Sequence, residues 1–183
     1  NREVMTIIKE GFANSFMLMA LAWILQGVLG IFLGLVAGAN IGSLRDKFIK
    51  AYALIFASTP SFWLGLVLIM IFSLKLKIFP ASMGSPVGVL TKDISFADRL
   101  YHMALPCLCL SLVGTSNIIL HTRAKTEDIL NEDFISYAKA RGMSKREIIN
   151  KYALKNLILP GLSLLFTYFS ELFSGTCLLY TSP

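Results

Sequence analysis

The chain has 183 residues, of which 55% are hydrophobic and only 15% are charged, with a formal net charge of +6. Soluble domains carry about 25% charged residues, and residues 11–44 form a run of 34 without Asp, Glu, Lys, Arg or His. A helix needs roughly 20 apolar residues to cross a bilayer. The composition therefore excludes an ordinary soluble domain and predicts an all-α integral membrane protein.

The first apolar run predicts a membrane span over about residues 12–39. Gly27, Gly30, Gly34 and Gly38 recur in it at intervals of three and four, which places them on one face of a helix. Small residues at this spacing allow a second helix to approach closely in lipid. We expect a packing partner on this face, the alternative being that glycine is simply common in membrane helices.

The second apolar run predicts a span over about residues 51–74 that contains Thr59-Pro60. Proline removes a backbone hydrogen bond and bends a helix, so we expect a structural kink at this point. A break that contacts a transported substrate is the alternative. Residues 75–102 then form a segment outside the membrane, with turns and a short surface helix around 95–101.

Two further spans are predicted at about residues 103–120 and 157–175. The third span carries the polar residues Ser116 and Asn117, and the fourth carries Glu171. Placing a carboxylate at the bilayer centre costs roughly 2.5–3.5 kcal/mol, so Glu171 should face protein or the membrane edge. Together with Pro60 these residues are candidates for a translocation path. Hydrogen bonds between helices and a solvated helix end are the structural alternatives.

Residues 121–156 form a charged loop between the third and fourth spans and are expected to fold as two short helices. Four apolar residues of the first helix follow the i, i+4, i+7, i+8 spacing of one face: Leu130, Phe134, Tyr137 and Ala138. Gly142 can adopt the left-handed conformation that closes a helix. Ser144 and Glu147 have the spacing of a capping box at the start of the second helix. The pattern predicts a cornered pair of helices.

The basic residues indicate the orientation of these segments. Eleven Lys and Arg lie in residues 45–50 and 121–156, against six in the N-terminal tail and residues 75–102. Basic residues accumulate in cytoplasmic loops, so the loop at 121–156 is predicted to be cytoplasmic. It could be a DNA-binding helix-turn-helix, part of an ion-coupled secondary carrier or membrane enzyme, or a docking surface for a cytoplasmic motor. A DNA-binding domain would need a hydrophobic core of its own, which this loop lacks. A carrier or membrane enzyme would need paired polar groups within the bilayer, which the spans lack.

Several motifs carry a resemblance to a known family. The run Ala138-Lys-Ala-Arg-Gly142 resembles the cytoplasmic signature loop of ABC-transporter permease subunits, and Pro60-Ser-Phe-Trp-Leu-Gly65 resembles a motif of the branch that imports oligopeptides, dipeptides and nickel. Supporting matches lie elsewhere along the chain: Phe79–Ser82, Leu105-Pro106, Leu120–Arg123, Tyr152–Asn156 and Pro160. Within the signature itself, Ser136 and Tyr137 depart from the family's Glu-Ala, and Ala138 is kept.

The resemblance implies the transmembrane domain of a type I ABC importer, as a fragment over residues 1–176. Compared with the family's usual six spans, a first and a last span are expected to be missing. Residues 177–183 depart from the family pattern and look truncated.

The resemblance also implies partners and site residues. The partners are a second permease subunit, two cytoplasmic ATPase subunits that bind ATP and Mg, an extracytoplasmic solute-binding protein and membrane lipid, but no nucleic acid. The chain itself is expected to be no enzyme and to hold no catalytic, cofactor or metal site, and to lie in a bacterial or archaeal inner membrane. The ATPase-docking residues would be Phe134, Tyr137, Ala138, Ala140, Arg141, Gly142, Met143, Ser144 and Glu147.

Overall fold

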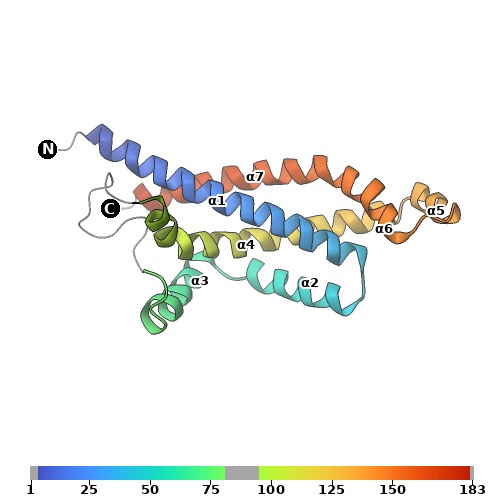
Figure 1. The fold of residues 1–183 in the computed structure, drawn as a ribbon, viewed down its shortest axis with the longest axis horizontal. Coiled ribbons are helices and arrows are strands. Elements are labelled where there is room, and N and C mark those ends of the chain that lie inside the picture. Colours follow the sequence, from blue (N-terminus) through green and yellow to red (C-terminus); the bar gives the residue numbers. More distant parts are fainter. Residues whose placement is uncertain (1–3, 81–94, 182–183) are drawn as a thin grey trace.

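The computed structural model describes residues 4–80 and 95–181, and all regular structure within these ranges is helical. This confirms the predicted all-α fold. The long helices α1, α4 and α7 run side by side, with α5 and α6 together at one end (Figure 1). In chain order the elements are α1 (Val4–Ala39), α2 (Leu44–Ala57), α3 (Ser61–Leu68), the π-helical η1 (Ile69–Lys75), α4 (Phe96–Leu130), α5 (Asp133–Ala140), α6 (Lys145–Ile148), the π-helical η3 (Ile149–Ala153) and α7 (Leu154–Thr181).

Within residues 4–80 and 95–181, three helical stretches are long and apolar enough to cross a membrane, and a bent pair of helices could supply a fourth span. α4 has 35 residues, or about 50 Å at 1.5 Å per residue, which exceeds the roughly 30 Å of bilayer hydrocarbon. The short surface helix expected around 95–101 is the first part of α4. The turns expected between residues 81 and 94 lie outside the described residues.

The second predicted span differs from a continuous, kinked helix. α2 ends at Ala57, and the α3–η1 pair continues at 100° to it. The backbone amide of Ser58 donates to Leu54 and Phe56 and so closes α2, while Thr59 Oγ1 donates to the Ile55 carbonyl at 2.7 Å. Pro60 is extended, with φ −60° and ψ 130°, and starts α3 as its N-cap. Proline has no amide to continue the first helix, so the bend becomes a corner.

The glycine face of α1 packs against α4, which confirms the predicted close approach. A Cβ added at Gly30 would lie 2.6 Å from Ile118 Cβ, and one added at Gly34 would lie 2.5 Å from Thr122 Cβ. Such distances are far below van der Waals contact. The missing side chains therefore let the two helices pack backbone to side chain along most of their shared length.

The same interface buries an amide that the sequence patterns did not single out. Gln26 is 1% exposed, and its amide oxygen lies against Gly114 of α4, where a Cβ would overlap it. Gly27, at the start of the same glycine face, lies against Leu165 of α7, and the indole of Trp23 donates to the Leu165 carbonyl at 2.7 Å. These contacts join α1, α4 and α7 into one bundle.

Candidate functional site

The corner between α5 and α6 is closed by a glycine with a left-handed backbone. Gly142 has φ +81°, its amide donates to the Lys139 carbonyl at 2.9 Å, and the Met143 amide donates to the Ala138 carbonyl at 3.2 Å. This pair of bonds is the Schellman arrangement that terminates helices. Gly142 therefore has the predicted helix-closing role. We call residues 133–148 the corner block.

The second helix of the corner block begins at the predicted capping box. Ser144 Oγ accepts from the Glu147 amide at 3.3 Å, and the Ser144 amide donates to Glu147 Oε2 at 2.7 Å. Two amides at the helix start are thereby satisfied by side chains. The second helix is longer than expected, however, because α6 continues through η3 into α7 without a loop. The corner block is therefore joined to a candidate membrane span without an intervening loop.

The inner face of the corner block differs from the predicted one. Ile135, Ala138 and Ile148 form its small core, against which Leu130, Met143 and Tyr152 pack. The predicted face combined Leu130 and Ala138 with Phe134 and Tyr137, but those two aromatic rings lie outside. Ile135 and Ala138 are three residues apart and so share a face of the short helix. Of the two neighbouring apolar stripes of α5, the buried one is the stripe that packs against Ile148.

The outer face of the corner block presents aromatic and basic side chains. Phe134 is 42% exposed and Tyr137 is 67% exposed. The Arg141 guanidinium lies 5.8 Å from the centre of the Tyr137 ring, within the range of a cation–π contact. The rings of Phe134 and Tyr152 lie 5.7 Å apart, which ties this surface to η3.

The predicted docking residues divide by exposure. Ala138 is buried and Met143 is half-buried, so both support the corner from within. The other seven are exposed: Phe134, Tyr137, Ala140, Arg141, Gly142, Ser144 and Glu147. Exposed aromatic and Arg side chains on a rigid support are typical anchors of protein interfaces. The geometry suits recognition of another protein.

The candidate path residues are placed on three different elements. Pro60 is exposed at the corner between α2 and α3, while Ser116 is buried in α4 and donates to the Leu112 carbonyl of its own helix at 2.9 Å. Asn117 is half-buried on α4. Glu171 falls within α7, but its side chain lies outside the described ones. Besides this bond within α4, Ser116 is hydrogen-bonded to the Tyr52 side chain of α2, which agrees with the interhelical bond expected as the alternative.

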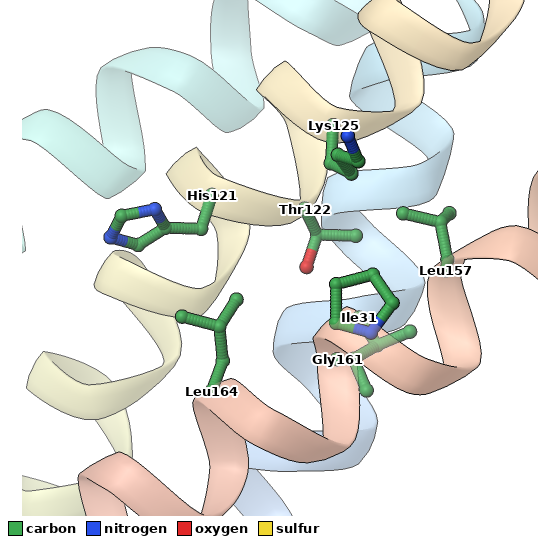
Figure 2. Close-up of a pocket in the computed structure, with 8 residues that line it drawn as sticks. Ile31, His121, Thr122, Lys125, Leu157, Gly161 and Leu164 are labelled. Atoms are coloured by element: carbon green, nitrogen blue, oxygen red, sulfur yellow. The ribbon is translucent and has the colours of Figure 1, made fainter.

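A crevice between α1, α4 and α7 shows how tightly the bundle packs. It has a volume of about 10 Å³, lined by Ile31 of α1, by His121, Thr122 and Lys125 of α4, and by Leu157, Pro160, Gly161 and Leu164 of α7 (Figure 2). A space of this size accommodates no more than about one water molecule. This crevice is therefore too small to serve as a substrate site.

A cluster of polar residues near the corner block was missed by the sequence patterns. The Asp46 carboxylate is bound by the Arg123 guanidinium through two hydrogen bonds, and Lys145 Nζ donates to Asn40 Oδ1 at 3.0 Å. The signal in the sequence was weak, because polar and charged residues are common in the loops that flank membrane spans. An acidic residue inside the basic run 45–50 was the available hint.

Comparison with known proteins places this arrangement in a family. The family described as "Binding-protein-dependent transport system inner membrane component" matches residues 30–181. The chain belongs to this family. It is therefore a multi-pass inner-membrane chain with the transmembrane fold of a type I importer, as its resemblance implied.

Similar curated proteins are permeases named for peptides. The oligopeptide transport system permease protein AppB of Bacillus subtilis is 30% identical over 161 residues, which cover 88% of this chain and 50% of the relative. The di/tripeptide transport system permease protein DppB of Pseudomonas aeruginosa is 30% identical over 175 residues, covering 87% and 52%. The dipeptide transport system permease protein DppB of Escherichia coli K12 is 29% identical over 178 residues, covering 87% and 52%. The chain spans about half the length of the relatives it matches.

Proposed function

We propose that this chain is part of a permease subunit of an ATP-driven ABC importer for peptides, and that the corner block docks on a cytoplasmic ATPase subunit. The observation that carries the docking role is the exposed outer face, with Tyr137 and Arg141 held beside a corner that is closed on both sides by hydrogen bonds. Rigid anchors lose little conformational entropy on binding, which favours recognition by a partner.

Peptides are the proposed cargo because of the names of the relatives. Those compared above are named for oligopeptides, di/tripeptides and dipeptides. The nickel or metal-chelate cargo that the sequence resemblance left open has no such support. Selection of the cargo is assigned to a separate extracytoplasmic solute-binding protein.

The proposed mechanism uses the continuity of the helices. Closure of two ATPases on ATP and Mg would draw the corner blocks of two permease subunits together. Since α6, η3 and α7 form one unbroken stretch, this movement reorients the spans between inward-facing and outward-facing states. The excess of basic residues in 45–50 and 121–156 supports a cytoplasmic position of the block.

The experiment is transport by the full-length permease, reconstituted in vesicles with its ATPase and binding-protein partners. Gly142→Asp should reduce peptide uptake about tenfold, which corresponds to a docking loss of about 1.4 kcal/mol. Asp is among the residues that tolerate a positive φ best, and a Cβ at this position meets no atom within 4 Å. The variant should therefore insert and fold, with a cost of about 1 kcal/mol for a side chain at positive φ.

Two controls separate docking from other effects. Asn150→Asp adds the same carboxylate at an exposed position of η3 and should leave uptake near the wild-type rate. Tyr137→Cys, at an exposed position of the outer face, should cross-link to the ATPase in the wild-type background and much less with Gly142→Asp. Normal uptake by Gly142→Asp, or the absence of any cross-link from position 137, would contradict the docking role.

A further inference from the structure

The turn between α1 and α2 is bound tightly to α4 by an ion pair. Arg123 Nε donates to Asp46 Oδ1 at 2.6 Å and another guanidinium nitrogen donates to Asp46 Oδ2 at 3.0 Å. The side chain of Asp46 is 4% exposed and that of Arg123 is 16% exposed. Glu127 accepts a third bond from Arg123 at 3.2 Å. Two-point contacts of this kind fix both distance and orientation.

The Asp46 carboxylate also holds the turn itself. Asp46 Oδ2 accepts from the Gly42 amide at 2.9 Å, and the backbone amide of Asp46 donates to Ser43 Oγ at 3.2 Å. Ser43 is the N-cap of α2. The Asp46 carboxylate thus attaches the start of α2 to α4, so a movement of α2 at this end must break or carry the Asp46–Arg123 pair.

The corner block reaches the same turn from the other side. Lys145, the first residue of α6, donates from Nζ to Asn40 Oδ1 at 3.0 Å. The Asn40 amide group is oriented by its donation to the Val36 carbonyl at 2.9 Å, and the Asn40 carbonyl accepts from the Ser43 amide at 3.1 Å. A contact therefore runs from the corner block through Asn40 to the N-cap of α2.

At its far end α2 leads into a sharp bend. The chain turns through 100° between α2 and the α3–η1 pair. A rotation of α2 at the turn is therefore carried to the corner at residues 58–60, where α3 departs. Helices transmit such displacements because their backbone hydrogen bonds resist bending.

We infer that Asn40, Asp46, Arg123 and Lys145, here called the turn network, are positioning residues that transmit movement of the corner block to α2 and α3. This inference rests on the proposed function, because it requires that a motor moves the corner block. The inference adds a second route for movement of the corner block: the movement reaches α2 and α3 through the turn network, in addition to α7, which continues directly from the block. Without the turn network, the ATPases would still close and hydrolyse ATP, but α2 would not follow.

The test measures ATP hydrolysed per peptide imported by the full-length complex in vesicles. Asp46→Asn removes the charge and keeps an oxygen for the Gly42 amide, and it should raise this ratio about fivefold, within the range seen for residues that couple two sites. Lys145→Met removes the contact with Asn40 without touching the ion pair, and it should raise the ratio about threefold. Lys145→Arg keeps a donor and should restore most of the coupling. Lys155→Met removes a charge at an exposed position of α7 and should leave the ratio unchanged.

The outcomes separate this inference from a structural role and from the proposed function. A residue that only stabilised the fold would lower hydrolysis and import together and leave their ratio unchanged, and this result would overturn the inference. A wild-type ratio for Lys145→Met with normal assembly would overturn it as well. In either case the cross-link from position 137 to the ATPase would remain. Absence of that cross-link in a Tyr137→Cys complex without these substitutions would instead contradict the proposed docking.

Discussion

The α1–α4 interface and the corner block both depend on glycine, but for opposite reasons. At Gly34 the backbone is helical and space is lacking, since an added Cβ would lie 2.5 Å from Thr122 Cβ and 3.0 Å from the Ile119 carbonyl oxygen. At Gly142 the backbone has φ +81° and nothing lies within 4 Å of an added Cβ. The interface is thus closed by contacts within the chain, while the corner at Gly142 has open space around it.

The difference shows which parts of the molecule tolerate change. A packed interface responds to volume, because interiors have few voids. An exposed corner responds to backbone conformation and capping, because its surroundings impose no steric limit. Substitutions that separate these two responses test the comparison directly.

The largest effect is expected in the interface. Gly34→Ala should lower the free energy of unfolding of the full-length protein by about 1–3 kcal/mol, the usual cost of overpacking. Thermal unfolding in detergent, followed by the reactivity of Cys107 and Cys109, which are buried in α4, would measure it. Gly65→Ala is the matched control, because its Cβ would lie at an ordinary 3.7 Å from Cys109 Sγ. Equal stability of Gly34→Ala and the wild type would contradict the close packing of α1 on α4.

An intermediate effect is expected at the start of α6. Ser144→Ala removes the hydroxyl that accepts from the Glu147 amide and should cost about 1 kcal/mol of local stability, as for other N-caps. Hydrogen exchange of the amides at 145–148 should accelerate about fivefold, the equivalent of that free energy, while exchange in α1 stays unchanged. Ser136→Ala, an exposed position of α5 without a capping role, should leave these amides as protected as in the wild type.

The smallest effect on stability is expected on the outer face. Tyr137 is 67% exposed, so Tyr137→Ala should change the free energy of unfolding by no more than about 0.5 kcal/mol. The free energy of binding between the Tyr137→Ala permease and the ATPase should weaken by more than about 1 kcal/mol, as for other interface anchors. Phe62→Ala, at a 73% exposed position of α3, should leave that affinity unchanged. A large loss of stability with unchanged affinity would place Tyr137 in the core and contradict the open corner.

The features that the sequence predicted well arise from neighbouring residues. The capping box joins positions 144 and 147, the helix closure at Gly142 involves positions within five residues, and the glycine face of α1 follows from helical periodicity alone. Membrane character follows from the long run without charges. Each of these depends on spacing along the chain, which can be read directly.

The features that were missed or predicted differently depend on residues far apart. Phe134 and Tyr137 were expected on the same face as Ala138, but Ile135 packs with Ile148 instead. The bend at Pro60 was expected as a kink and is a corner of 100°. The pair Asp46–Arg123 joins residues 77 positions apart, and no local pattern indicates which of many charges will meet.

The amino-acid sequence by itself determined that this protein is helical and membrane-embedded, and that it carries a capped, glycine-closed corner, because short-range hydrogen bonds and hydropathy act between near neighbours. Only the tertiary structure decided that α4 receives the glycine face, that the aromatic side of α5 faces outward, and that Lys145 reaches the α1–α2 turn. These contacts depend on packing between segments that are distant in the sequence. Several residues have the chemistry to make each contact, and the three-dimensional arrangement determines which of them does.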